Sequence, residues 1–152
     1  MLIPFFVGIL IIAILDQAAK FFAAGLLQSV KTFPLWENVF HLTYLENSGA
    51  GWGVFSEHTW LLTVLTFIVI VAVVAYVVVK KPKPQMLNLA LTFIIGGAIG
   101  NFIDRVRLGY VIDFFDFTLI NFPVFNVADC FITVGAVLFA VYVIFYSDKK
   151  EK

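Results

Sequence analysis

The sequence predicts an α-helical integral membrane protein with four transmembrane helices and a small sheet, and three observations support this fold class. The 152 residues are 62% hydrophobic and 13% charged, with a mean hydropathy of +1.01, whereas a soluble domain is roughly 45–50% apolar and about 25% charged. Four apolar stretches approach or exceed the roughly 20 residues that span a bilayer. Between the first two stretches, aromatic and β-branched residues favour strands. We expect residues 1–152 to form a single membrane-embedded domain.

The first apolar stretch extends from Leu2 to about Leu27, and we interpret it as a retained spanning helix. A signal peptide would begin with basic residues before a short apolar region, but no Lys or Arg precedes Lys20. Asp16 and Lys20 are four residues apart, so they share a helix face and can pair. The pair either only lowers the cost of two charges near the membrane boundary or also braces a functional site.

The segment 28–58 mixes polar and aromatic residues and is expected to lie at the membrane surface, where aromatic side chains are enriched. Within it, Val39–Leu45 is rich in aromatic and β-branched residues, which predicts a strand of a small sheet. The following segment, Asn47–Gly53, has three glycines in its last five residues, which permits close backbone approach or positive φ. It is either a simple turn or the lining of a binding cleft with Asn47 as a polar contact.

Two further spanning helices are predicted in the middle of the chain. Thr59–Val79 is a run without a charged residue, and the Lys- and Pro-rich segment 80–84 ends it. Met86–Ile103 is expected to be the third helix. Gly96 and Gly100 form a G-x-x-x-G pattern in it, which we interpret as a site of tight helix packing.

The remaining apolar sequence contains one extended segment and the fourth helix. Val111–Phe125 is interrupted by Asp113, Asp116 and Pro123, so it is a poor spanning helix and is expected to be extended or re-entrant. Asn126–Tyr146 is expected to form the fourth helix, because its last 17 residues are uncharged.

The distribution of positive charge predicts which side of the membrane each end of the chain occupies. With four spanning helices, both termini lie on one side, and six lysines fall there: Lys80, Lys81, Lys83, Lys149, Lys150 and Lys152. The opposite side has three cations: Lys31, Arg105 and Arg107. Because cytoplasmic loops carry an excess of Lys and Arg, we expect cytoplasmic termini and an acidic cluster on the extracytoplasmic side. That cluster consists of Asp104, Asp113, Asp116 and Asp129.

Carboxylates near a bilayer are costly and mark a functional site by default. Asn101 and Asp104 share a face near the end of the third predicted helix, where the partial negative charge of a helix C-terminus disfavours an acid. Asn126 and Asp129 repeat this N-x-x-D spacing at the start of the fourth helix, where a capping box is the simpler explanation. The presence of Asp113 at the same membrane face favours a functional pair with Asp129.

Two carboxylates that lie close together in a cleft of low dielectric constant cannot easily both ionise, so they share a proton. Such a pair supplies a general acid and a general base that activate water toward a carbonyl group without a metal. Cation binding, proton or ion relay in a transporter and a non-enzymatic membrane assembly subunit stay open as alternatives. A transporter is disfavoured because the chain has no internal repeat and its acids lie at one end.

The composition limits which partners and cofactors we expect. The net charge is zero, which gives no indication of a nucleic-acid partner. The single cysteine, Cys130, rules out an internal disulfide framework and a cysteine zinc cluster. His41 and His58 fall in different segments, so we expect no histidine metal site and no cofactor.

Four motifs in order resemble those of one family along almost the whole chain. They are D-Q-A-A-K at 16–20, N-S-G-A-G-W-G at 47–53, G-N-F-I-D-R at 100–105 followed by V-I-D-F at 111–114, and F-N-V-A-D at 125–129. Each motif alone is weak, but together, at these spacings, they are highly specific. The chain closely resembles the bacterial lipoprotein signal peptidases, also called signal peptidase II.

The resemblance implies an aspartic endopeptidase of the bacterial cytoplasmic (inner) membrane. Family enzymes cleave prolipoproteins just before the cysteine that carries a diacylglyceryl group. The catalytic pair carries over to Asp113 and Asp129. Residues that match positions binding substrate or supporting the site are Asn47, Asn101, Asp104, Arg105, Asn126, Asp16 and Lys20. Asp116 is an additional carboxylate without an assigned role, and Cys130 is interpreted as a helix residue and not a nucleophile.

The same resemblance implies four transmembrane helices with a small extracytoplasmic β-cradle. The antibiotic globomycin, an inhibitor of the family, is expected to occupy the catalytic cleft. Diacylglyceryl-modified prolipoproteins and membrane lipid are the expected partners, and we expect the enzyme to be a monomer.

Overall fold

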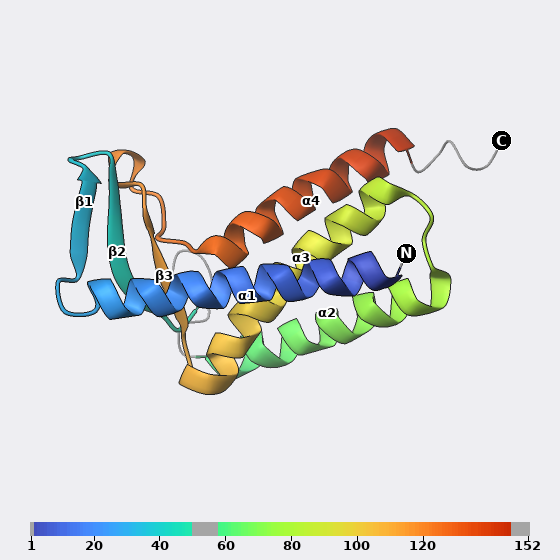
Figure 1. Ribbon diagram of the computed structural model, residues 1–152, viewed down its shortest axis with the longest axis horizontal. Coiled ribbons are helices and arrows are strands. Elements are labelled where there is room, and N and C mark those ends of the chain that lie inside the picture. Colours follow the sequence, from blue (N-terminus) through green and yellow to red (C-terminus); the bar gives the residue numbers. More distant parts are fainter. Residues whose placement is uncertain (1, 50–57, 147–152) are drawn as a thin grey trace.

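A computed structural model describes residues 2–49 and 58–146. Within these residues, four helices are long and apolar enough to cross a membrane, and they extend along the long axis of the molecule (Figure 1). They are α1 (Leu2–Leu27), α2 (Thr59–Lys80), α3 (Gln85–Leu108) and α4 (Val127–Tyr146). The predicted class, four membrane helices with a small sheet, is therefore confirmed. Residues 149–152, which contribute three of the lysines used to predict orientation, lie outside the described part.

A three-stranded antiparallel sheet stands at one end of the bundle, where α1 ends and α4 begins (Figure 1). Its order is β1 (Thr32–Trp36), β2 (Phe40–Asn47) and β3 (Val111–Asp116). The strand predicted at 39–45 is confirmed from Phe40 onward by β2, and Val39 lies in the turn before it. The expectation of an extended segment after the third helix is confirmed by β3, which pairs with β2.

The third helix is longer than the sequence predicted, since α3 continues past Ile103 to Leu108. Arg105 and Arg107 lie in its last turn, where positive charge interacts favourably with the helix dipole. Gly109 ends the helix in the left-handed conformation, with φ of 81°, and its N–H donates to the Arg105 carbonyl at 3.1 Å. Asp104 therefore lies inside the helix and one turn before its end, which corrects the predicted boundary.

Close contact between helices depends on small residues of α3, the most buried of the four. In the most apolar part of each helix, 56% of the residues of α3 are buried but only 6% of those of α2. A Cβ atom at Gly96 would collide with Ile12 and one at Gly100 with Asp16, so this face of α3 packs directly on α1. The packing interpretation of the G-x-x-x-G pattern is confirmed.

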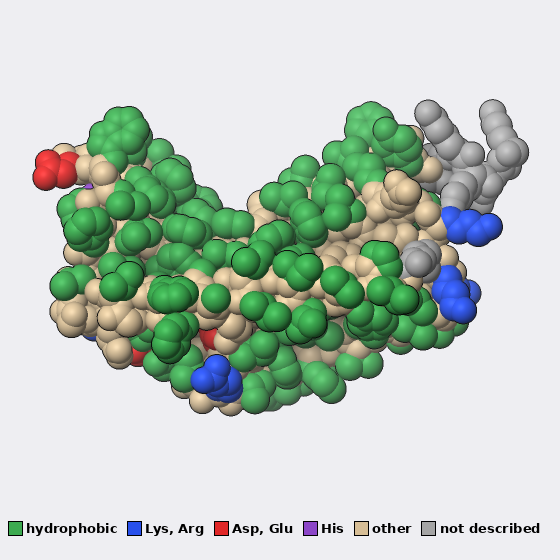
Figure 2. All heavy atoms as spheres, viewed as in Figure 1, with side chains coloured by type: hydrophobic (Ala, Val, Ile, Leu, Met, Phe, Trp, Pro, Cys, Tyr) green, Lys and Arg blue, Asp and Glu red, His purple; other side chains and the backbone are tan. Residues whose placement is uncertain are grey.

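The surface of the bundle is strongly apolar. Hydrophobic side chains cover its length in the view of Figure 2, and Lys and Arg side chains lie at the end away from the sheet and near the C-terminal end of α3. Many large apolar side chains of α1 and α2 are exposed, for example Leu10, Phe21 and Ile68. An exposed apolar surface of this extent is typical of a protein whose helices contact lipid.

The contact between α3 and α4 gives a direct test of this packing. A Cβ atom at Gly97 would collide with the Ala128 carbonyl oxygen, which is backbone and cannot rotate away. We expect Gly97→Ala to destabilise the protein by about 1–3 kcal/mol and to lower its thermal unfolding midpoint in detergent. Gly25→Ala is the matched control, because no atom lies within 4 Å of a Cβ there; equal midpoints for the two variants would contradict the packing account.

Candidate active site

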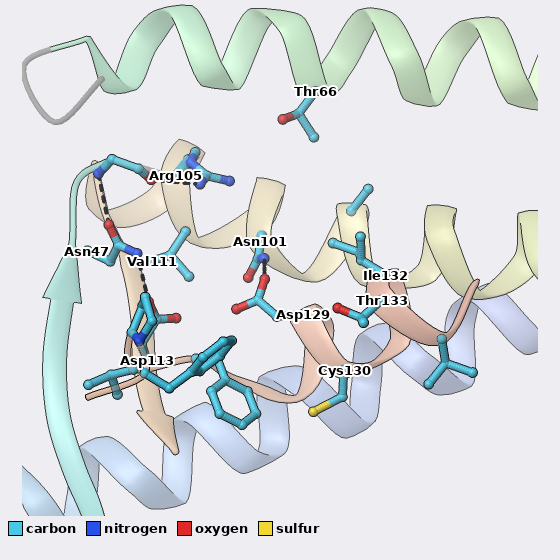
Figure 3. Close-up of a pocket in the computed structure, with 17 residues that line it drawn as sticks. Asn47, Thr66, Asn101, Arg105, Val111, Asp113, Asp129, Cys130, Ile132 and Thr133 are labelled. Carbon is cyan, nitrogen blue, oxygen red and sulfur yellow. Dashed lines mark hydrogen bonds between the residues drawn. The ribbon is translucent and has the colours of Figure 1, made fainter. Parts of the chain in front are cut away.

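A cavity of about 670 Å³ lies where the sheet meets the helices (Figure 3). Side chains from β2, β3, α2, α3, α4 and the segment 122–125 line it. Five of the polar residues singled out in the sequence are among them: Asn47, Asn101, Arg105, Asp113 and Asp129. Residues distant in sequence therefore meet at one site.

Asp113 lies in the middle of β3 and is only 1% exposed. Asn47 Nδ2 donates to its Oδ2 atom at 2.8 Å, and Asn126 Nδ2 donates to its Oδ1 atom at 2.6 Å. Burial raises the pKa of Asp113 to about 7, with the nearby Asp129 carboxylate adding to the rise, although the two amide donors and Lys20 oppose it. Asp113 can therefore hold a proton near neutral pH.

Asp129 lies in the first turn of α4 and is half-buried. Its Oδ2 atom accepts the Asn126 N–H at 3.2 Å, and its own N–H donates to Asn126 Oδ1 at 3.0 Å. This reciprocal pair is a capping box, so the capping interpretation is confirmed. Capping leaves Oδ1 available, and that atom accepts from Asn101 Nδ2 at 2.8 Å beside the cavity (Figure 3).

Asn126 connects the two acids and is fully buried. Its amino group donates to Asp113, and also to Asn101 Oδ1 at 3.0 Å. Its backbone N–H and its side-chain oxygen hold Asp129. One asparagine thus fixes both carboxylates, which line the same cavity.

Behind this site, a buried charge cluster fills the contact between α1 and α3. Lys20 Nζ lies 2.8 Å from Asp16 Oδ2 and 2.9 Å from Asp104 Oδ2, and all three side chains are at most 3% exposed. The same ammonium donates to Asn101 Oδ1 at 2.8 Å. The Asp16–Lys20 pair is therefore more than a local ion pair, since it contacts a residue that itself holds Asp129.

Arg105 and Asn47 organise the other side of the cavity. Arg105 Nη2 donates to the Gly49 carbonyl at 3.2 Å, and the Gly49 N–H donates to Asn47 Oδ1 at 3.0 Å. The start of the glycine-rich segment thus lies against the cavity, as one of its two interpretations required. Residues 50–53 of that segment are outside the described residues.

Several contacts were not predicted from the sequence. Gln17 Nε2 donates to Asp104 Oδ1 at 2.8 Å and to the Gly100 carbonyl at 3.2 Å. The only feature of the sequence that could have indicated this role of Gln17 is its position next to Asp16 in a mostly apolar helix. The backbone N–H groups of Ile112 and Ala128 donate to Asp104 and Asp16, and no side-chain pattern could have indicated them.

Asp116, the fourth carboxylate of the predicted cluster, does not line the cavity. It accepts a hydrogen bond from Thr43 Oγ1 at 2.7 Å, across the β2–β3 pair. Of the residues that the structure describes, no three His, Cys, Asp or Glu side chains are grouped to hold a metal ion. The arrangement at the cavity is instead a pair of acids held by amide donors.

Four membrane helices with a cavity at one end that holds two acids define a multi-pass membrane protein, and comparison with known proteins shows its family. Residues 8–145 match the family described as signal peptidase (SPase) II. The chain belongs to this family of lipoprotein signal peptidases. It is accordingly a bacterial membrane peptidase that removes signal peptides from prolipoproteins.

Curated relatives and solved structures agree over nearly full length. A lipoprotein signal peptidase of Caldanaerobacter subterraneus subsp. tengcongensis is 47% identical over 135 residues, which cover 88% of this chain and 91% of the relative. One of Clostridium acetobutylicum is 38% identical over 148 residues, with 95% and 94% covered. A solved bacterial membrane enzyme superimposes with a TM-score of 0.87 at 30% identity, covering 98% of this chain and 93% of that one.

The bridging role of Asn126 can be separated from its role as a helix cap. We expect Asn126→Ala to lower the free energy of unfolding by about 1–2 kcal/mol, as loss of an N-cap does, and also to reduce prolipoprotein cleavage per folded molecule. Asn88→Ala is the control, because Asn88 bonds the Pro84 carbonyl at the start of α3 at 3.0 Å and does not line the cavity. The Asn88→Ala variant should be less stable than the wild type but cleave the precursor normally. Equal cleavage activity in the two variants would contradict the bridging role of Asn126.

Proposed function

We propose that this peptidase is an aspartic endopeptidase in which Asp113 and Asp129 form the catalytic pair. Its substrates are diacylglyceryl-modified prolipoproteins, cleaved immediately before the lipidated cysteine. The observation that carries the proposal is that these two carboxylates line one cavity and are bridged by Asn126. The proposal involves no metal or cofactor.

The surroundings favour unequal roles for the two acids. Asp113 is the proton donor, because burial and the neighbouring carboxylate raise its pKa to about 7. Asp129 is assigned the role of base, because it is less buried than Asp113. The proposed acid and the proposed base therefore lie on two different elements, β3 and α4.

In the proposed reaction, Asp129 takes a proton from a water molecule whose oxygen attacks the scissile carbonyl carbon. Asp113 gives its proton to the carbonyl oxygen, which yields a neutral tetrahedral gem-diol. The C–N bond then breaks as the proton on Asp129 passes to the leaving amine. A hydroxyl proton of the gem-diol returns to Asp113, which leaves a carboxylic acid on the signal peptide and restores both aspartates.

The other polar residues hold this pair in position. Asn47 and Asn126 fix Asp113, and Asn101 fixes Asp129. We assign Arg105 to substrate positioning, since it lines the cavity and ties down the Gly49 carbonyl. The buried cluster that supports Asn101 comprises Asp16, Lys20 and Asp104.

The cavity also suggests how a lipidated substrate is held. Apolar residues, among them Ala98, Ile132 and Val134, line it on the side of the spanning helices. We propose that acyl chains lie along these helices while the peptide backbone reaches the acids. Globomycin is proposed to occupy the same cavity.

Orientation follows from the same charges that the sequence analysis used. Lys80, Lys81 and Lys83 lie at the end of the bundle remote from the sheet, so that end is assigned to the cytoplasm. The sheet, the cavity and both acids then face the extracytoplasmic side, and both termini are cytoplasmic. We propose that the chain acts as a monomer with one catalytic domain.

Substitution of each acid tests the catalytic pair. Asp113→Asn and Asp129→Asn are each expected to abolish cleavage of a purified diacylglyceryl-modified precursor, because either change removes the proton donor or the base. Asp116→Asn is the matched control and should retain cleavage, since Asp116 bonds Thr43 outside the cavity.

Membrane insertion and unfolding midpoints should be compared across the three variants. A chelator is expected to leave the wild-type rate unchanged. Full activity in either of the first two variants would overturn the assignment, and loss of wild-type activity with the chelator alone would point to a metal.

The pH dependence of kcat/KM tests which acid holds the proton. Because Asp113 must be protonated and its pKa is about 7, kcat/KM should fall roughly tenfold per pH unit above that value. The hydrogen bond from Asn47 lowers the pKa of Asp113, so Asn47→Ala should move this alkaline limb to higher pH. An alkaline limb that stays in place, or moves to lower pH, would contradict the assignment of Asp113 as the acid.

A further inference from the structure

Each of the three asparagines that bond the two carboxylates has its oxygen turned toward a group that can only donate a hydrogen bond. These contacts are Gly49 N–H to Asn47 Oδ1 at 3.0 Å, Asp129 N–H to Asn126 Oδ1 at 3.0 Å, and Lys20 Nζ to Asn101 Oδ1 at 2.8 Å. A backbone N–H and an ammonium can donate a hydrogen bond but cannot accept one, so an asparagine amide must face them with its oxygen. The amino group of each asparagine is thereby turned toward a carboxylate of the proposed catalytic pair.

Lys20 differs from the other two donors because it is a side chain from a distant helix. It is 2% exposed, and its three N–H groups match three acceptors: Asp16 Oδ2, Asp104 Oδ2 and Asn101 Oδ1. The two carboxylates fix the ammonium, and the ammonium fixes the Asn101 amide. Asn101 cannot turn over while Lys20 is in place, because its amino group would then face an ammonium.

Removal of the ammonium would weaken this preference, because Asn126 Nδ2, at 3.0 Å, would be the remaining donor to Asn101 Oδ1. The Asp104 carboxylate, freed from Lys20, attracts N–H donors, so the Asn101 amino group would turn toward it in part of the molecules. The amide oxygen would then face Asp129 Oδ1, and two oxygens at hydrogen-bond distance need a proton between them. Asp129 would hold that proton and could no longer accept one from water.

We propose that Lys20 is a positioning residue for the proposed reaction, holding the Asn101 amide so that Asp129 stays ionised as the base. This inference rests on the proposed function, because it gives Asp129 a specific protonation state. It connects the ion cluster between α1 and α3 to the proposed base on α4 through the side-chain amide of Asn101.

Other charged and titratable groups also act on Asp129 and must be kept constant in a test. They are Asp113 from β3, Arg105 from α3 and Cys130 of α4 itself, and the charges of Asp16, Lys20 and Asp104 lie behind them. Removal of Lys20 alone would change the local net charge as well as the amide orientation. Removal of Lys20 together with Asp16 leaves the net charge unchanged.

The test compares Lys20→Met/Asp16→Asn with Asp16→Asn alone, by the pH dependence of kcat/KM on a diacylglyceryl-modified precursor. In both variants the new Asn side chain can still accept the Ala128 N–H that Asp16 accepts at 2.8 Å. Asp104 keeps its donors from Gln17 and Ile112. We expect the acidic limb of the double variant to move about one to two pH units higher, the equivalent of one hydrogen bond to a charged group.

The single variant retains the ammonium, so its acidic limb should not move to higher pH. Lys20→Arg/Asp16→Asn, which restores a donor, should move the limb back toward the wild-type position. In an Asn101→Leu background, replacement of Lys20 and Asp16 should cause no further shift, because the amide through which Lys20 acts is gone.

An acidic limb that is unmoved in a folded, active double variant would overturn the inference. A shift that persists in full in the Asn101→Leu background would also overturn it, because Lys20 would then act on Asp129 by another route. If the double variant does not fold, Lys20→Met is compared in the wild-type and Asn101→Leu backgrounds: an upward shift only where Asn101 is present supports the inference, and an equal shift in both backgrounds overturns it. Failure of the proposed function would give a different result from failure of this inference. If the proposed function were wrong, Asp129→Asn would still cleave the precursor.

Discussion

The ammonium of Lys20, buried between two carboxylates, is the interaction on which the rest of the site depends. A charge removed from water costs several kcal/mol unless it is paired, and loss of one partner leaves the others uncompensated. The cluster extends beyond its own ions: Asp16 accepts the Ala128 N–H of α4, and Asp104 accepts the Ile112 N–H of β3. It therefore fixes the two elements that carry Asp129 and Asp113, each by a backbone contact one residue before the acid.

The apolar bundle and the sheet contribute in different ways. Glycines let α3 approach α1 and α4 closely, which brings Asn101 within reach of both Lys20 and Asp129. The sheet positions Asp113 beside the bundle. Pairing of β3 with β2 places Asp113 opposite Leu45 and near Asn47 of the neighbouring strand. A polar site forms at this junction, where helices end and backbone groups become available to side chains. Amide donors then surround both acids without introducing a further charge.

Much of this arrangement was predictable because it depends on local patterns. Hydropathy indicated the four spans, aromatic and β-branched residues indicated β2, and costly carboxylates indicated the acidic pair. The end of α3 was wrong by five residues, because the last turn of that helix is polar and only Gly109 marks its stop. Gln17 and the backbone donors were missed because their partners are distant in sequence. Asp129 shows that a cap and a proposed base need not be alternatives, since its two oxygens serve different neighbours.

We propose that Asp113 and Asp129 share one proton in the substrate-free enzyme at neutral pH. Infrared difference spectroscopy of the purified protein during a pH titration measures this directly, through the carbonyl stretch of a protonated carboxylic acid. One such signal is expected to titrate near pH 7, to be absent from Asp113→Asn and to be retained in Asp116→Asn. A site with no protonated carboxylic acid below that pH, or a signal unchanged in Asp113→Asn, would contradict it.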